Sequence, residues 1–575
     1  MPPSTLQSVG QCSSASIFPD LPTELILQIL QDLDNESLVQ LSLTCRHLHF
    51  VSLDQFFSRA NINTAIGWLT VTDTPPPQTL RALRSALNLQ SLKTIYFAFT
   101  PDFRRLFCDM SDLCGLLARL PSIQSVTLQF GRVDNWAHDL LRLKTRCIEP
   151  RRWQKLLTGL IRIILDRSCV ELQVMGLSHL SQLYIVSGLA RPSPEGAGPG
   201  QRPPGIAGVA ETSRRSNKEI PRTLPVKSES FFKRIFSGSR SLGTKQLNTS
   251  SSSSTDAPHM FDEPNDVSGT NRRTGVSLNL CPTPRELHFY RSNVLFQPPI
   301  YEWTMLTLKV ESFNITTLSF RSLEVPKEVW AEMLGSLTLT HLKKFEICST
   351  VLSIKMGVCF IDINDFLVRH SNITDLHLHT VEFPSSSVPV TPPVLPLLKR
   401  FTAHPSYINW ILQNSVLESG TFQNLDSVTI SAEFNLSKFN YNLFDSALQT
   451  VSRTRSTALT LKFISNQWGA RRWFMKHVDL GIENSLLSEL KGIVSLIISL
   501  SFSVEFHDDA VVVLPTWLHF FPKLEHVGFN GLSQETTSLL KDERFMAELA
   551  TACPNLKTVT VQSEEFRLNS QYDNK

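Results

Sequence analysis

The sequence predicts an α/β protein in which three short N-terminal helices precede a solenoid of strand–helix repeats, and a disordered insertion interrupts the solenoid. Three observations support this fold class. Apolar residues near the start recur at helical spacing, a short apolar motif recurs every 25 to 35 residues from position 315 onward, and a stretch rich in Pro, Gly and Ser separates two parts of the array. At 575 residues the chain is too long for one compact core, which also favours a repeat array or several domains.

The predicted organisation follows the places where pattern and composition change together. The segments are a disordered N-terminus (1–17), a helical module (18–62), the first part of the solenoid (63–188), a disordered insertion (189–280), the second part of the solenoid (281–565) and a disordered tail (566–575).

The helical module begins where a helix-start pattern meets a run of apolar residues. Pro22 suits the first turn of a helix, and Asp20 is placed to cap it. Apolar residues follow at helical spacing over 25–33, and after a short break two more helices are predicted over 36–43 and 44–51. The apolar arc of the first helix covers about 200°, which is wider than the ~100° stripe of a surface helix, so we expect it to pack against either the rest of the chain or another protein.

These residues resemble an F-box. The pattern Leu-Pro-x-Glu-Leu-x-x-x-Ile-Leu-x-x-Leu is followed, after a break, by Leu-x-x-Leu-x-Leu-x-Cys-Arg-x-Leu, and the stretch from Ser52 to Ile62 is similar to its counterpart in many fungal F-box proteins. The resemblance implies binding to a Skp-type adaptor and, through it, to a cullin-based ubiquitin ligase. An ordinary amphipathic helical hairpin is the open alternative. The residues implied to contact the adaptor are Leu21, Pro22, Glu24, Leu25, Ile29, Leu30, Leu38, Leu41, Cys45 and Arg46.

After this module an apolar-x-x-apolar-x-apolar motif recurs, with helix-like stretches between its copies. Its period-2 part predicts a strand, and a near-constant period of this size is typical of a solenoid. A non-repetitive α/β domain that matches the motif by chance is the alternative. Predicted helices cover 80–87, 106–120, 153–167, 325–337, 361–369, 407–413, 443–451 and 545–552. The motif occurs at Leu92/Ile95/Phe97, Ile123/Val126/Leu128, Leu180/Leu183/Ile185, Ile315/Leu318/Phe320, Leu342/Phe345/Ile347, Ile373/Leu376/Leu378, Leu398/Phe401/Ala403, Leu425/Val428/Ile430, Ala458/Leu461/Phe463, Ile493/Leu496/Ile498, Leu524/Val527/Phe529 and Leu556/Val559/Val561.

The repeats resemble leucine-rich repeats of the long, irregular kind. The Asn or Cys that ends the family's repeat is mostly absent, and Phe, Val and Ile replace many of the leucines, so the exact repeat count stays open.

The segment 189–280 has no apolar periodicity and contains a serine run, so we expect a disordered insertion that acts as a solvated tether. Its excess of Lys and Arg over 191–245 leaves a weak nuclear-import signal open. Phosphorylation of Ser216 or Thr274 and docking by residues 231–236 are further open functions.

Composition indicates an intracellular protein, cytoplasmic or nuclear. The net charge of +3 gives no sign of a nucleic-acid partner, and ten scattered cysteines without a Cys-x-x-Cys pair favour free thiols. The first 17 residues are polar, unlike a signal peptide, and the most apolar run, 493–500, is too short to span a membrane.

No catalytic, cofactor-binding or metal-binding motif is present in the sequence. His377 and His379 would share one strand face, but no Cys or other third ligand accompanies them at a usual zinc spacing, so we expect surface histidines and no metal.

The predicted function is therefore a non-catalytic, cofactor-free substrate receptor of an SCF-type (Skp–cullin–F-box) ubiquitin ligase. An interaction scaffold that ubiquitinates nothing is the alternative, and an enzyme fused to an F-box lacks a motif. The residues between the inward apolar positions would form the concave face, where a mixture of polar, aromatic and histidine side chains favours a protein segment over nucleic acid as ligand. The middle of that face predicts substrate-binding residues Arg321, Glu346, His377, His379 and His404.

Overall fold

A computed structural model describes most of the helical module and of both solenoid parts. The described residues are 21–60, 62, 67–71, 78–87, 89, 92–99, 103–130, 150–176, 284–349, 356–379, 391–413, 422–431, 440–463, 467–500 and 508–568. The predictions of disorder over 1–17 and 189–280, the cap at Asp20 and the motif copy at Leu180 concern residues outside these ranges.

The N-terminal module consists of three helices, α1 (Thr23–Asp32), α2 (Asn35–Leu41) and α3 (Arg46–Arg59). Pro22 precedes α1 as its N-cap residue, and the Asp34 carboxylate caps α2 by accepting a hydrogen bond from the Ser37 amide at 2.7 Å. At the end of α3 the Arg59 guanidinium donates to the Leu30 and Gln31 carbonyls at 2.7 and 2.6 Å, which satisfies the open C-terminal end of α1.

The rest of the described chain is built on one 15-stranded sheet whose strands lie in sequence order. All neighbouring pairs are parallel except the last, β14 and β15, so each strand returns beside its predecessor as in a solenoid. The strands are β1 (Trp68–Val71), β2 (Thr94–Phe99), β3 (Ser125–Phe130), β4 (Glu171–Met175), β5 (Arg285–Tyr290), β6 (Ile315–Arg321), β7 (Lys344–Cys348), β8 (Asp375–Leu378), β9 (Arg400–Ala403), β10 (Ser427–Ser431), β11 (Ala458–Phe463), β12 (Ser495–Leu500), β13 (His526–Asn530), β14 (Thr558–Val561) and β15 (Glu564–Arg567).

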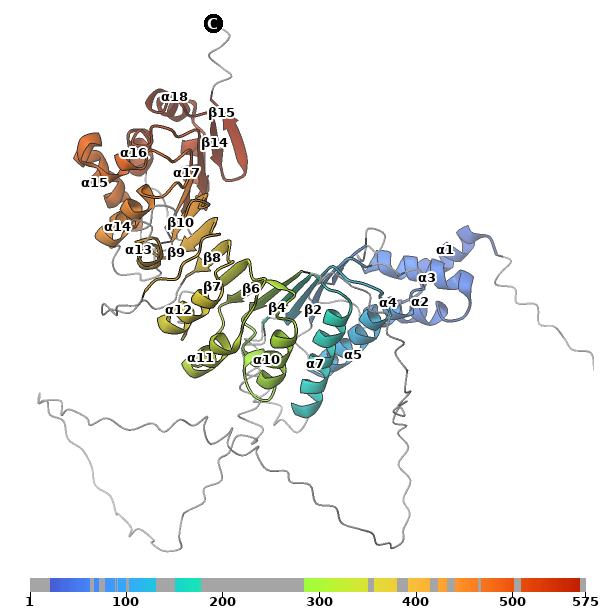
Figure 1. Ribbon diagram of the computed structural model, residues 1–575. Coiled ribbons are helices and arrows are strands. Elements are labelled where there is room, and N and C mark those ends of the chain that lie inside the picture. Colours follow the sequence, from blue (N-terminus) through green and yellow to red (C-terminus); the bar gives the residue numbers. More distant parts are fainter. Residues whose placement is uncertain are drawn as a thin grey trace, which may run out of the picture. The chain divides into compact units, whose positions relative to one another are not determined.

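Helices connect the strands and lie along one side of the sheet, as α10, α11 and α12 show most clearly (Figure 1). We call the opposite side the free face. The helices are α4 (Thr79–Ser85), α5 (Phe103–Arg119), α7 (Pro150–Asp166), α10 (Tyr301–Val310), α11 (Lys327–Ser336), α12 (Phe360–Arg369), α13 (Pro405–Gln413), α14 (Tyr441–Ser452), α15 (Gln467–Asn484), α16 (Asp508–Leu518), α17 (Gln534–Leu540) and α18 (Glu543–Ala552), with 3-10 turns η4 (Asn293–Phe296) and η6 (Leu486–Glu489).

The core lies between the helices and the sheet. Every second residue of each strand points into it. Pairs such as Leu318/Phe320 and Val428/Ile430 are 0% exposed, and the apolar motif predicts most of these positions. Because each repeat buries its apolar face only against its neighbours, the array is stabilised along its length by contacts between consecutive repeats.

The strands on either side of the predicted insertion are direct neighbours. Glu171 of β4 pairs with Glu286 of β5, and the register continues to Met175 and Tyr290. The sheet therefore continues in register across a long separation in sequence.

All eight helices predicted between the motif copies are present, with ends within a few residues of the prediction. The strands β1, β4 and β5 and the helices α10 and α15 to α17 were not predicted. One boundary and one strand register are corrected. Phe566 and Arg567, expected in the disordered tail, belong to β15, and β11 is two residues out of the predicted register because Leu459, not Leu461, pairs with Val428. None of the described helices combines the length and apolarity needed to cross a bilayer.

Candidate functional site

The outer surface of the helical module is apolar to an unusual degree. On α1 the side chains of Ile26 and Leu30 fill the core at 1% exposure, whereas Leu25 and Ile29, one turn apart, are 47% and 42% exposed. Leu27, on the other flank of the buried stripe, is 40% exposed. This helix therefore presents apolar residues on both sides of its buried stripe, which agrees with the wide apolar arc read from the sequence.

The structure divides the predicted adaptor-binding residues into two groups. Leu30 and Leu38 are 1% and 0% exposed, so they belong to the module's own core and are not part of a contact surface. Their place in the motif reflects packing of α1 and α2 on α3. Those at least partly accessible are Leu21, Pro22, Glu24, Leu25, Ile29, Leu41, Cys45 and Arg46.

Two exposed apolar residues of this module were not predicted as contacts. Leu43, just after α2, is 60% exposed, and Phe50 on α3 is 36% exposed. Leu43 could have been predicted as a contact residue, because it lies inside the F-box pattern of the sequence. Phe50 lies outside the pattern and could not be assigned to either side of α3 by spacing alone.

The second candidate surface is the free face of the sheet. Strand register places Ser319 of β6, Glu346 of β7, His377 of β8 and Thr402 of β9 side by side, so the predicted row of face residues has the predicted order here. In the adjoining row Arg321 lies opposite Cys348. The predicted member Tyr184 lies outside the described residues, and Gln173 and His288 occupy the row on β4 and β5.

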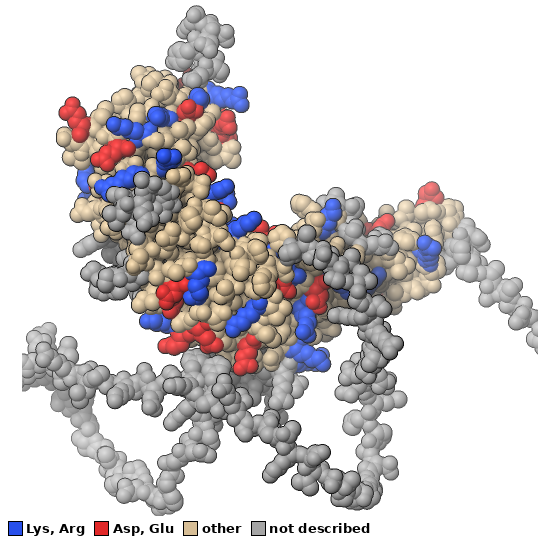
Figure 2. Space-filling model, viewed as in Figure 1, with Lys and Arg blue, Asp and Glu red and all other residues tan. Residues whose placement is uncertain are grey.

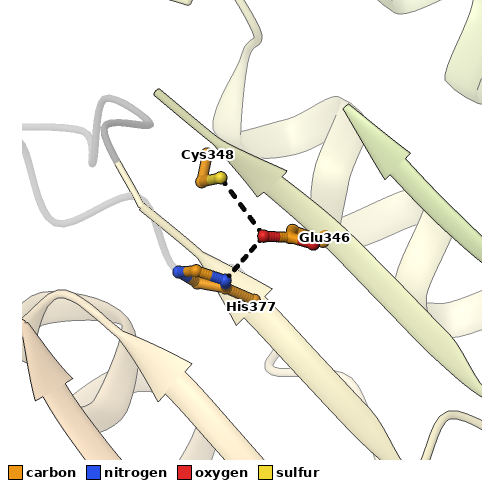
Figure 3. Close-up of side chains that lie close together, drawn as sticks. All are labelled: Glu346, Cys348 and His377. Atoms are coloured by element: carbon orange, nitrogen blue, oxygen red, sulfur yellow. Dashed lines mark hydrogen bonds and ion pairs between the residues drawn. The ribbon is translucent and has the colours of Figure 1, made fainter. Parts of the chain in front are cut away.

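Glu346 is the centre of a polar cluster on this face (Figure 3). One carboxylate oxygen, Oε2, accepts hydrogen bonds from Ser319 Oγ at 2.9 Å and from Arg321 Nη2 at 2.8 Å. The other, Oε1, lies 3.0 Å from His377 Nδ1 and 3.3 Å from Cys348 Sγ. The five side chains come from three consecutive strands, which the parallel register brings together.

Burial and pairing decide the charges in this cluster. Burial opposes ionisation of Glu346, but the hydrogen bonds and charges of His377 and Arg321 outweigh it and hold its pKa well below the usual range. Burial raises the pKa of the Cys348 thiol, with the Glu346 carboxylate adding to the shift. The cluster therefore holds a carboxylate, a guanidinium and a protonated thiol at neutral pH.

The two remaining residues predicted to bind substrate, His379 and His404, are buried and not on the surface, at 5% and 9% exposure. Burial lowers the pKa of His379 to about 3, with nearby His377 and Lys462 contributing, and lowers the pKa of His404 to about 4. Both imidazoles are therefore neutral at physiological pH. Arg321 and His377, whose side chains are 40% and 30% exposed, are the predicted residues that a ligand can reach most readily.

The prediction of no metal rested on ligand spacing along the chain and stays a prediction, but the fold brings two further donor residues beside His377. Glu346, Cys348 and His377 offer three donor atoms that all lie within 4.8 Å of one another. Cys348 is the functional candidate that sequence reasoning missed. Cys348 lies two residues after Glu346, so the sequence alone puts both on one face of the strand. Only the pairing of β7 with β8 brings His377 beside them.

A Ser–His–Asp chain of hydrogen bonds exists on the helix side, between α14, α15 and η6. Ser485 Oγ lies 2.9 Å from His477 Nδ1, and His477 Nε2 lies 3.2 Å from Asp445 Oδ1. His477 is 0% and Ser485 3% exposed, and Ser485 Oγ also accepts from the Leu487 amide as the cap of η6. Because no substrate can reach the hydroxyl in this state, the arrangement is structural and not a hydrolytic site.

Charges of both signs are interspersed on the face of the molecule shown in Figure 2, with no broad region of one sign. This mixture resembles an ordinary soluble surface and differs from the basic stripe of a nucleic-acid-binding protein.

Comparison with known proteins agrees with these features at the N-terminus. A scan of protein families matches residues 18–62 to the family described as F-box-like. No curated protein matches the chain. Among solved structures, the leucine-rich repeat-containing protein LegL7 from Legionella pneumophila is similar with a TM-score of 0.28 and 12% identity, over 50% of this chain and 77% of LegL7.

A protein from Bacteroides fragilis is similar with a TM-score of 0.27 and 11% identity, over 44% of this chain and 68% of that protein. At such TM-scores the assignment of the fold rests on the strand register described above. The family match and the strand–helix array together define the class: an F-box-like domain joined to a solenoid of the leucine-rich-repeat type. The match identifies an F-box-like domain over residues 18–62, and the described chain beyond it forms a parallel strand–helix array.

Proposed function

We propose that this chain is the substrate receptor of an SCF-type ubiquitin ligase. The F-box-like domain binds a Skp-type adaptor, the adaptor connects it to a cullin, and the solenoid binds the protein that is to be ubiquitinated. The observation that carries the proposal is the exposed apolar surface of the matched domain, above all Leu25 and Ile29 on α1.

Exposed aliphatic side chains one turn apart on a helix favour burial against a partner. Leu25 and Ile29 each leave nearly half of their surface in water, although the same helix buries Ile26 and Leu30 completely. Since α1 already uses one stripe to pack on α3, its exposed flank is free to contact a second protein. An adaptor with an apolar groove is the partner that this flank fits.

A hydrogen bond also joins the domain to the first part of the solenoid. The buried ring of His49 on α3 lies 2.8 Å from the Ser42 carbonyl through Nδ1, and its Nε2 accepts a hydrogen bond from the Leu87 amide at 3.2 Å, just beyond α4.

The chain needs no catalytic residue for this role. A receptor accelerates ubiquitin transfer by raising the effective concentration of substrate beside the ubiquitin-loaded enzyme that the cullin recruits. The free face of the sheet is the proposed substrate surface, where Arg321 and His377 present a charged donor and an imidazole for hydrogen bonding to a protein segment.

The proposal is tested by changing Leu25 and Ile29 together to Asp. Full burial of a Leu or Ile contributes about 1.5–3 kcal/mol, so burying the exposed half of each contributes about 1 kcal/mol. Losing both weakens adaptor binding by roughly 30-fold, and two carboxylates in an apolar interface weaken it further. Titration of purified Skp-type adaptor into the full chain, followed by calorimetry, measures this change.

The chain offers a matched control on α10. Leu306 and Val310 have the same spacing of four residues and are 61% and 68% exposed, but they lie on the solenoid. Changing this pair to Asp should leave adaptor affinity within twofold of the wild type. Equal affinity of the two double variants would show that the exposed flank of α1 does not bind the adaptor.

A further inference from the structure

The cluster around Glu346 contains the donor atoms of a metal site, and metal binding there does not require the chain to be a ligase receptor. We propose that Glu346, Cys348 and His377 bind a divalent transition-metal ion of the zinc class on the free face of the sheet. A carboxylate oxygen, a thiol sulfur and an imidazole nitrogen are the three donor types that Zn²⁺ takes from proteins.

The spacing of the donors fits such an ion. In a tetrahedral zinc site with bonds of about 2.0–2.3 Å, neighbouring donor atoms lie about 3.3–3.6 Å apart. Here Glu346 Oε1 lies 3.0 Å from His377 Nδ1 and 3.3 Å from Cys348 Sγ, and the three donors are all within 4.8 Å of one another. The two distances from Glu346 Oε1 are within a few tenths of an ångström of these values, and the separation of His377 Nδ1 from Cys348 Sγ, at most 4.8 Å, would close by up to about 1.2 Å around the ion.

The carboxylate is already oriented for this task. Ser319 and Arg321 hold Oε2 at 2.9 and 2.8 Å, which turns Oε1 toward the thiol and the imidazole. Outer hydrogen bonds of this kind fix the direction of ligands in metal sites and raise affinity. Because the guanidinium contacts the oxygen that faces away from the ion, it does not occupy a coordination position.

Access and charge are also suitable. The His377 side chain is 30% exposed, so an ion can enter from the free face without unfolding the sheet. On binding, the Cys348 thiol loses its proton to solvent, and His377 ligates through Nδ1 with its ring proton on Nε2. The ion's two positive charges are balanced by the carboxylate and the thiolate. Three protein ligands leave one position for water or for a side chain of a bound protein.

The test uses the full chain without adaptor, so its outcome does not depend on the proposed function. Zn²⁺ affinity is measured by competition with a chromophoric chelator, and Co²⁺ is added separately to detect a thiolate-to-cobalt charge-transfer band. The wild type should bind one equivalent that Cys348→Ala and His377→Gln bind at least about 100-fold more weakly. The cobalt band should disappear in Cys348→Ala, and Zn²⁺ binding by the wild type should release at least the Cys348 thiol proton.

His288 supplies the matched control. Its Nε2 lies 3.6 Å from a Glu286 oxygen on the same face, but neither β5 nor its neighbours β4 and β6 contain a cysteine. His288→Gln should therefore bind Zn²⁺ like the wild type. If Cys348→Ala proves unfolded by circular dichroism, His377→Gln decides alone, because that side chain is partly exposed. No binding by the wild type, or equal binding by wild type and His377→Gln, would overturn the proposal.

Discussion

Replacing Glu346 by Ala should destabilise the solenoid far more than removing an exposed ion-pair carboxylate. The Glu346 side chain is only 3% exposed and accepts from three donors, at 2.8 to 3.0 Å, with Cys348 Sγ at 3.3 Å. Arg321 and His377 can turn toward water after the change, whereas Ser319, at 0% exposure, is left without its acceptor. An unsatisfied buried hydroxyl costs about 1–3 kcal/mol, and each hydrogen bond to a charge contributes about 1.5–3 kcal/mol.

Allowing for rehydration of the two exposed donors, we expect a loss of about 3 kcal/mol, near the lower end for breaking a buried ion pair. Glu346→Gln keeps an acceptor for Ser319 and should lose roughly half as much. The matched control is Glu564→Ala, which removes an equally short ion pair, 2.7 Å to Lys541, from a carboxylate that is 63% exposed. It should cost at most about 1 kcal/mol.

The assay is urea unfolding followed by circular dichroism, with a chelator present so that no metal contributes, and with the slopes compared between variants. Equal losses for Glu346→Ala and Glu564→Ala would refute the view that the cluster is a buried, mutually satisfied network.

Three further predictions follow from other parts of the molecule. Burial lowers the pKa of His404 to about 4, against about 6.5 in the unfolded chain, so between these pH values only the unfolded chain binds the extra proton. The stability of the fold should therefore fall as pH drops from 6.5 toward 4, by about 1.4 kcal/mol per pH unit from this residue. The substitution His404→Gln should flatten that slope, measured by urea unfolding at several pH values. A pH dependence unchanged by this substitution would contradict the burial. Replacing residues 195–275 by a short Gly/Ser linker should move the melting temperature by no more than about 2 °C, since β4 and β5 pair directly, and a larger fall would show that a folded repeat was cut. His377→Ala should weaken capture of the substrate but not of the adaptor, with the exposed His519→Ala, just beyond α16, as control. Equal substrate capture by both would remove the Glu346 cluster from the proposed substrate surface.

Much of the fold could be predicted because solenoid repeats are local. Each copy of the apolar motif specifies its own inward residues, so Leu318, Phe345 and Leu376 could be placed without knowing the rest of the chain. The apolar motif gave the wrong strand register where its apolar positions fit more than one register. In β11 the residues Leu459, Leu461 and Phe463 alternate for a whole strand, so the motif fits in two registers and spacing cannot choose between them.

The candidate sites were predictable only in part, because exposure and cross-strand contact are properties of the folded chain. The F-box pattern mixes residues that form its core, such as Leu30, with residues that face outward, such as Ile29. Likewise the sequence placed Glu346 and His377 on one face as separate surface groups. It could not show that parallel register joins them, with Cys348, into one buried cluster.

The most direct test of the receptor function is assembly from purified parts, measured by size-exclusion chromatography. The full chain is mixed with a cullin in the presence and absence of a Skp-type adaptor. If the F-box-like domain links the chain to a ligase, the chain and the cullin co-elute in equal amounts only when the adaptor is present, and the Leu25→Asp/Ile29→Asp variant elutes alone. Failure of the wild-type chain to join the adaptor–cullin complex would contradict the proposed function.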